Sequence, residues 1–167
     1  SPLPLASRGS KAALVFFTIV VLIACGLYLR YEWEKYDESA SKEAIQLAQS
    51  LESLLHPQHV QELSGSPEDI GKPEYEMAKT GLMRLVDTTN PVHFSYLMAE
   101  QNGNLVFLMD SESPGSPDYS PPGQVYEEAD DWAWAPFRTG KTVITPPVTD
   151  RWGTWISALT PIKDPDG

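Results

Sequence analysis

The sequence predicts an α+β protein in which a transmembrane helix and a long N-terminal helix precede and pack on an antiparallel sheet. Three observations indicate this class. An uncharged apolar run lies near the N-terminus, apolar residues then recur at helical spacing, and the second half contains short apolar runs between turn residues. The complete sheet should have five strands. Asp164-Pro165-Asp166-Gly167 is a turn signal, so we expect its final strand to be missing and to follow Gly167.

The apolar run "AALVFFTIVVLIACGLYL" occupies residues 12–29 and contains no charged residue. At helical rise it extends about 27 Å, close to the thickness of the hydrocarbon core of a bilayer. Arg8 and Lys11 precede it, whereas acidic residues dominate after it. The positive-inside rule therefore predicts a cytoplasmic tail at 1–11, a transmembrane helix at 12–30 and an extracytoplasmic domain at 31–167, truncated at its C-terminus.

The single cysteine, Cys25, leaves a second kind of membrane anchor open. Leu22-Ile23-Ala24-Cys25 resembles a bacterial lipobox, in which the cysteine is lipidated. The apolar run continues past Cys25 to Leu29, however, where lipoproteins usually turn polar. We therefore expect an ordinary membrane residue and keep lipidation as the alternative.

Charge and motif content exclude several functions. Lys and Arg number 12 against 23 Asp and Glu, and this acidity disfavours a nucleic acid partner. The stretch "GSPEDIGKP" lacks the spacing of a phosphate-binding loop, and "EEADD" lacks that of a calcium loop. His56 and His59 are three residues apart but have no third ligand nearby in the sequence. We predict no catalytic residue, no metal and no cofactor.

Two helices should follow the membrane segment. The first continues from it with one apolar stripe, and the second begins at Pro73 and ends before Asn90-Pro91, after a polar loop at residues 64–72. The predicted stripe consists of Ala44, Ile45, Ala48, Leu51, Leu54 and Leu55. Such a stripe is typical of a helix that packs one face against a core.

A β-hairpin is predicted around Asn102-Gly103, a dipeptide typical of two-residue hairpin turns. The expected facing pairs are Met98 with Phe107, Tyr96 with Met109, and Ser95 with Asp110. A second hairpin is predicted around residues 150–153, with Pro146 and Pro147 at an edge or bulge. Between the hairpins, about 30 residues should form a loop with at most a short helix around Val125 to Trp134. Such a long loop suits a lid over a ligand, or simply a cover for the sheet.

Several of these stretches together resemble a known family. The hairpin "FSYLMAEQNGNLVFLMDSE", the loop "DYSPPGQVYEE" and the terminal "FRTGKTVITPPVTDRWGTWISALTPIKDPDG" follow a membrane helix and an outside helix. Over residues 32–167 the chain is similar to the extracytoplasmic Cache-like (PAS-like) sensor region of bacterial membrane signalling proteins. The resemblance implies a ligand-sensing input domain without catalysis of its own, a homodimer in full-length form, and a cytoplasmic histidine kinase, diguanylate cyclase or chemoreceptor module as output.

The resemblance also implies a pocket between the central strands and the long loop. The candidate ligand-binding residues there are Tyr96, Asp110, Tyr119, Tyr126, Arg138, Asp150, Arg151 and Trp152. The planar guanidinium of arginine can donate two parallel hydrogen bonds to a carboxylate. Arg138 and Arg151 therefore favour a small organic anion as the ligand. Arg138 is the preferred anchor because it follows the aromatic loop. Ordinary surface ion pairs are the alternative for both arginines. The alternative function is a membrane- or lipid-anchored interaction domain without signalling output.

Overall fold

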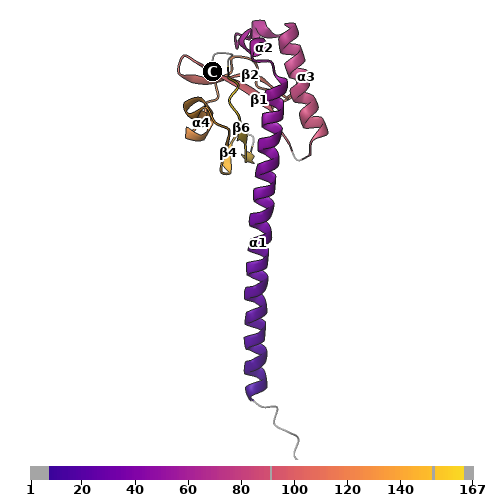
Figure 1. The fold of residues 1–167 in the computed structure, drawn as a ribbon, viewed down its shortest axis with the longest axis vertical. Coiled ribbons are helices and arrows are strands. Elements are labelled where there is room, and N and C mark those ends of the chain that lie inside the picture. Colours follow the sequence, from indigo (N-terminus) through magenta and orange to yellow (C-terminus); the bar gives the residue numbers. More distant parts are fainter. Residues whose placement is uncertain (1–7, 91, 152, 164–167) are drawn as a thin grey trace, which may run out of the picture. The chain divides into compact units, whose positions relative to one another are not determined.

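The structure is a computed structural model that describes residues 8–90, 92–151 and 153–163, and it confirms the α+β class (Figure 1). A long apolar N-terminal helix is followed by shorter helices and small antiparallel sheets. The chain divides into two compact units, one through Glu43 and one from Ala44 onward.

The first unit consists of most of helix α1, which is assigned over Arg8–Leu54. The helix includes a segment long and apolar enough to cross a membrane, and none of that segment is buried against protein. Beyond it, Arg30 pairs with Glu34 and Lys42 with Glu38, each one helical turn apart. Such exposed pairs suit a helix surrounded by water. The α1 helix therefore has an apolar part fit for a bilayer and a charged part fit for solvent.

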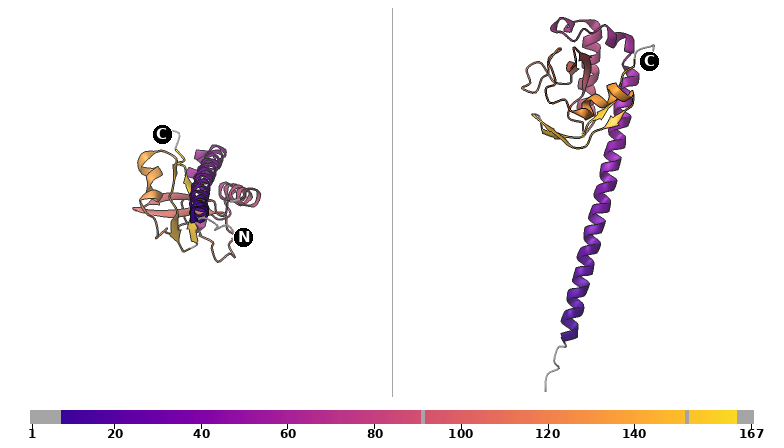
Figure 2. Two further views of the ribbon diagram at one scale, coloured as in Figure 1. Left: turned by 90° about the horizontal axis from the view of Figure 1, so that it is seen from below. Right: turned by 90° about the vertical axis from the view of Figure 1, so that its left-hand side faces the viewer.

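In the second unit, the end of α1 is followed by α2 (Pro57–Gln61), which was not predicted, and α3 (Pro73–Thr88), which was. Proline at the first position of α3 fits there because that residue needs no amide hydrogen bond. The core lies where α3 packs beside strand β2 (Asn104–Asp110) (Figure 2). Its buried residues are Tyr75, Ala78, Leu82, Leu97, Leu108 and Met109. Leu51 and Leu55 pack against this core, but Leu54 of the predicted stripe is 76% exposed.

The predicted first hairpin is present as β1 (Tyr96–Gln101) and β2 (Asn104–Asp110). Asn102 and Gly103 both have positive φ, as a two-residue turn of this kind requires. Met98 faces Phe107 as predicted, but a β-bulge next to Leu97 and Met98 shifts the register beyond them.

Two of the predicted hairpin pairs are therefore wrong. Met109 faces Leu97 rather than Tyr96, and Asp110 faces Tyr96 rather than Ser95. The bulge adds one residue to β2, and a shift of one residue changes which face of the sheet a side chain occupies. Met109 consequently joins the core instead of the opposite face.

The other strands form two further ladders instead of joining one sheet. Strand β3 (Val143–Ile144) pairs with β6 (Ala158–Leu159), and β4 (Val148–Asp150) pairs with β5 (Gly153–Trp155). The predicted second hairpin is thus divided in two, and no single five-stranded sheet forms among the described residues. Pro146 and Pro147 lie at the break, where they have no amide hydrogen to donate to a ladder.

The long loop covers the free edge of β2. Gly123 and Tyr126 donate their amide hydrogens to the carbonyls of Phe107 and Leu105, and Phe107 donates to Gln124. The loop's helix, α4, spans Asp131–Thr139, later than the predicted position around Val125 to Trp134. Two local signals place it there, because the Asp130 carboxylate caps its first turn and Gly140 ends it in a left-handed conformation.

The polar loop before α3 is organised by one buried carboxylate, that of Asp69. It accepts hydrogen bonds from the amides of Ser64 and Gly65 at 3.1 and 2.8 Å, and from Lys72 Nζ at 2.6 Å. Burial by itself would raise the pKa of Asp69, but these hydrogen bonds outweigh it and lower that pKa from 3.8 to about 2. The ionised form of Asp69 is therefore part of the fold.

Asp69→Asn should destabilise the domain by about 2 kcal/mol at neutral pH, because the lowered pKa measures the preference of the fold for the charged form. A group whose pKa is lowered on folding stabilises the protein above its unfolded pKa and ceases to do so as the pH falls. The difference from wild type should therefore narrow between pH 3.8 and about 2. Denaturant unfolding across this range measures it. Exposed Glu68→Gln is the matched control, and a difference that does not change with pH would contradict the prediction.

Candidate functional site

The ammonium group of Lys79 joins α3 to the start of the long loop. Lys79 Nζ donates to Asp110 O at 2.7 Å, to Asp110 Oδ1 at 3.0 Å and to the carbonyl of Glu112. Both side chains of the Lys79–Asp110 pair are 8% exposed. The remaining carboxylate oxygen of Asp110 accepts the amide hydrogen of Ser120 at 2.6 Å. Asp110 thus holds α3, the end of β2 and the loop together.

Tyr119 lies in the same cluster. Lys79 Nζ is 4.9 Å from the centre of the Tyr119 ring, a cation–π distance. Burial and a hydrogen bond with Tyr119 raise the pKa of Tyr75. The structure therefore brings Asp110 and Tyr119 together, but around a lysine that the sequence analysis did not single out. The available signal was a lysine placed among the apolar residues of a predicted amphipathic helix.

A second group of predicted residues meets on the other face of the hairpin. The Tyr96 and Phe107 rings lie 5.9 Å apart edge to face, and Phe107 and Tyr126 lie 5.8 Å apart. The Tyr126 hydroxyl makes a long hydrogen bond of 3.5 Å to Asp150 Oδ2. We call Tyr96, Phe107, Tyr126 and Asp150 the aromatic row. It unites the first hairpin, the long loop and the end of β4.

The phenols of the aromatic row are held in their neutral form. Burial raises the pKa of Tyr96, although a hydrogen bond with Ser157 acts in the opposite direction. Burial raises the pKa of Tyr126 as well, and the negative charge of Asp150 raises it further. Both hydroxyls therefore keep their protons at physiological pH and can donate or accept a hydrogen bond.

The two predicted arginines each form an ion pair with a different carboxylate. Arg138 NH1 is 2.8 Å from Asp131 Oδ1 on α4, with 59% of its side chain exposed. Arg151 Nε is 3.4 Å from Glu128 Oε1. In the sequence, Arg151 directly follows Asp150 of the aromatic row, and Glu128 comes two residues after Tyr126. Each arginine thus has a carboxylate partner, as the surface ion-pair alternative expected. Trp152, the last predicted site residue, lies outside the described residues.

Two buried polar atoms, one on the long loop and one on β5, have no hydrogen-bond partner among the described residues. They are the buried Oε2 of Glu128 and Nε1 of Trp155. The Trp155 indole packs edge to face on Phe94, and it lies so close to Gly153 that a Cβ there would be 2.9 Å from the ring. Trp155 was not among the predicted site residues, although it follows the turn that contains three of them.

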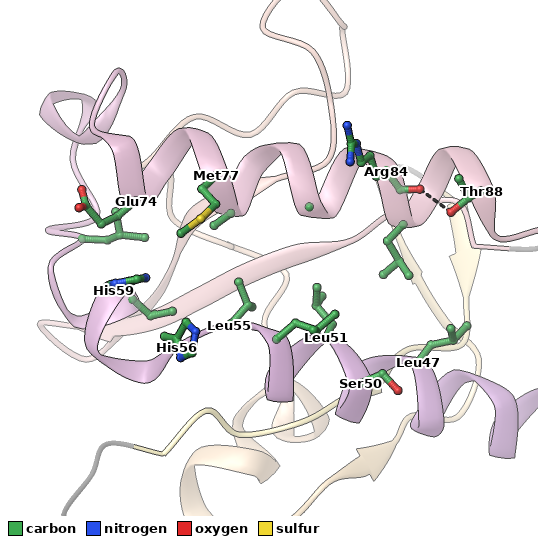
Figure 3. Close-up of a pocket in the computed structure, with 16 residues that line it drawn as sticks. Leu47, Ser50, Leu51, Leu55, His56, His59, Glu74, Met77, Arg84 and Thr88 are labelled. Carbon is green, nitrogen blue, oxygen red and sulfur yellow. Dashed lines mark hydrogen bonds between the residues drawn. The ribbon is translucent and has the colours of Figure 1, made fainter.

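A separate apolar groove of about 430 Å³ lies between the end of α1, α2 and α3 (Figure 3). His56, His59 and Glu74 lie at one end of it, and Arg84 and Thr88 lie at the other. The rings of His56 and His59 are 5.4 Å apart edge to face, and Nδ1 of His59 is buried with no hydrogen-bond partner in the described part of the chain. Among the residues that the structure describes, no three His, Cys, Asp or Glu side chains are grouped as metal ligands.

Comparisons with models of protein families, with curated proteins and with solved structures found no match to this chain.

Lys79→Met should cost roughly 3–5 kcal/mol of unfolding free energy, because it leaves the Asp110 carboxylate buried without its counter-charge. The double variant Lys79→Met/Asp110→Asn should recover part of that loss, since no charge is then buried. Arg138→Met removes an exposed pair and should cost less than about 1 kcal/mol. Denaturant unfolding of the three variants measures the ranking. Equal losses for Lys79→Met and Arg138→Met would show that Lys79 does not hold the loop.

Proposed function

We propose that this chain is the ligand-sensing input region of a bacterial membrane signalling protein. The apolar part of α1 anchors it, and the domain from residue 31 onward senses a small molecule outside the cytoplasm. The support consists of the resemblance to Cache-like sensor regions, the apolar helix, and the aromatic row formed by three separate chain segments. The full-length protein would be a homodimer with a cytoplasmic histidine kinase, diguanylate cyclase or chemoreceptor module.

The observation that carries this proposal is the position of Phe107, the member of the aromatic row that lies on β2. Phe107 belongs to the row, whereas its neighbour Leu108 belongs to the core against which Leu51 and Leu55 pack. A ligand that displaces Tyr126 from Phe107 would move β2, and β2 would transmit that movement to the end of α1. To shift the equilibrium between two positions of β2, such a ligand must bind the protein more tightly when β2 is in one position than when it is in the other.

The proposed ligand is a small organic anion that Arg151 binds beside the aromatic row. Such a ligand would compete with Glu128, whose Oε1 lies 3.4 Å from Arg151 Nε, a longer distance than that of a strong charge-assisted hydrogen bond. Arg138 is the weaker candidate, because its partner Asp131 lies at 2.8 Å on the same helix and both side chains are exposed. The neutral hydroxyl of Tyr126 would supply a hydrogen-bond donor.

A calorimetric screen of organic acids and amino acids against the full chain in nanodiscs tests this proposal. For a ligand that binds, Arg151→Ala should cost roughly 2–5 kcal/mol of binding free energy, because the ligand's charge loses its partner. Tyr126→Phe should weaken binding less, and Arg138→Ala is the matched control that should change little. If Arg151→Ala leaves the binding affinity unchanged, Arg151 does not form the anion site. A further variant, Tyr126→Ala, removes the ring and should weaken binding more than Tyr126→Phe. If neither Arg151→Ala nor Tyr126→Ala changes the affinity, the aromatic row is not the binding place.

The proposed topology can be tested by labelling of whole cells. In a Cys25→Ser background, a cysteine in place of exposed Ser113 should react with a membrane-impermeant maleimide. A cysteine in place of Ser10, before the apolar run, should react only after the cells are permeabilised. The reverse pattern would invert the orientation that Arg8 and Lys11 predict.

The alternative function is a membrane- or lipid-anchored interaction domain that transmits no signal. The open apolar groove favours it, because exposed apolar surface is typical of contact sites. Metabolic labelling with palmitate distinguishes lipidation of Cys25 from a plain transmembrane anchor. A downstream kinase or cyclase in the same reading frame would exclude the alternative.

A further inference from the structure

Three exposed aromatic residues lie where the apolar part of α1 ends. They are Tyr28, Tyr31 and Trp33, whose exposed fractions are 62%, 61% and 75%. The uncharged run ends at Leu29, and the first charge after it is that of Arg30. The three aromatic side chains therefore flank the point at which the surface of the helix changes from apolar to charged.

Their spacing along the helix fits one membrane–water interface. From Tyr28 to Trp33 the helix rises about 7.5 Å, and the interfacial layer on each side of the hydrocarbon core is about 5–8 Å thick. Tyr and Trp favour this layer because their rings are apolar, whereas the hydroxyl and the indole N–H can form hydrogen bonds with water or head groups. Tyr36, which is also exposed on α1, follows Tyr28 by about 12 Å at helical rise and falls beyond a layer of this thickness.

The three aromatic residues do not share one face of α1. Tyr28 and Tyr31 are three residues apart and lie on one side of the helix. Trp33 is two residues from Tyr31 and lies on the nearly opposite side. A protein partner covers one face of a helix, whereas lipid surrounds it. The distribution of the rings therefore favours lipid over a second protein chain.

The other end of the apolar run has a different composition. The sequence contains no Tyr or Trp before Tyr28, and Lys11 directly precedes the run. Long basic side chains adapt to a range of depths because their charged ends can extend to the interface. That end therefore defines the depth of the helix less sharply than rigid rings do.

We propose that Tyr28, Tyr31 and Trp33 form an interfacial belt that contacts the head-group layer of the membrane and sets the depth at which α1 is inserted. This inference rests on the membrane-spanning role of α1 in the proposed function. It does not depend on which way the helix crosses the membrane, nor on the aromatic row or Arg151.

Two opposing preferences act at the interfacial belt. The carboxylates of Glu32 and Glu34 favour water and draw the helix toward the side of its C-terminal end. Trp33 is the belt residue furthest from the apolar run, and its preference for the interface opposes that movement. Trp33→Ala should therefore let α1 move in that direction by one to two residues, about 1.5–3 Å.

The native cysteine measures this depth. Cys25 is exposed on α1 and is the single cysteine of the sequence, so a nitroxide spin label attaches at that position only. The full chain is reconstituted in phosphatidylcholine vesicles. Oxygen concentrates in the hydrocarbon and a water-soluble nickel complex stays outside it, so the accessibility of the label to each gives its depth. In Trp33→Ala the accessibility to nickel should rise and that to oxygen should fall.

Tyr36→Ala is the matched control for this measurement. It removes an exposed aromatic ring from the same helix, but from a position beyond the interfacial layer, so the depth of the Cys25 label should not change. Both variants should keep the helix, because alanine is the strongest helix former.

Contact between Trp33 and lipid is tested by quenching of tryptophan fluorescence with dibrominated phosphatidylcholines. Bromine near the head group should quench Trp33 more strongly than bromine near the end of the acyl chain. Four other tryptophans contribute to the emission, so the signal of Trp33 is the difference between wild type and Trp33→Phe. If neither lipid quenches that difference, Trp33 does not contact lipid and the interfacial belt is wrong.

The outcomes distinguish the interfacial belt from the membrane anchor itself. A Cys25 label within the hydrocarbon whose depth is unchanged in Trp33→Ala, or changes equally in Tyr36→Ala, would overturn the belt but not the transmembrane helix. A label as accessible to nickel as a label in water would contradict the transmembrane helix, and with it the membrane part of the proposed function. A lipidated Cys25, which has no thiol to label, would equally contradict it.

Discussion

The buried ion pair between Lys79 and Asp110 is the constraint on which the rest of the domain depends. A lysine inside α3 reaches the end of β2 and two carbonyls there, and the same carboxylate holds the amide of Ser120. Because both charges are withdrawn from water, neither can lose its partner without leaving an uncompensated charge buried, which is strongly destabilising. Helix α3, the hairpin and the first part of the long loop therefore keep one mutual arrangement.

That arrangement sets where the loop can go. Once the Ser120 amide is held by Asp110, the loop follows the edge of β2 from Gly123 to Tyr126 with backbone hydrogen bonds. A Cβ at Gly123 would be 2.7 Å from the Gly65 carbonyl, so the loop passes very close to the segment that Asp69 organises. The edge of β2 is thereby covered, and Tyr126 reaches the ring of Phe107.

The hairpin separates two surfaces with different proposed roles. One face contributes Leu97, Leu108 and Met109 to the core with α3, and the other contributes Tyr96 and Phe107 to the aromatic row. The groove lies on the helical side, where Gly81 leaves the wall of α3 without a side chain. A ligand at the aromatic row would act on a hairpin that shares this core with the end of α1, through the packing of Leu51 and Leu55.

The sequence by itself determined the elements whose signals are local. The uncharged run, the proline that begins α3 and the Asn102-Gly103 turn each specify their structure within a few residues, because backbone geometry and charge act at short range. It also identified Tyr96, Tyr126 and Asp150 as candidates, which the fold brings together. Only the tertiary structure decided the β-bulge, the division of the strands into three ladders, the pairing of Asp110 with Lys79 and the groove beside Gly81. These features depend on contacts between residues far apart in the chain, whose energies no local pattern contains.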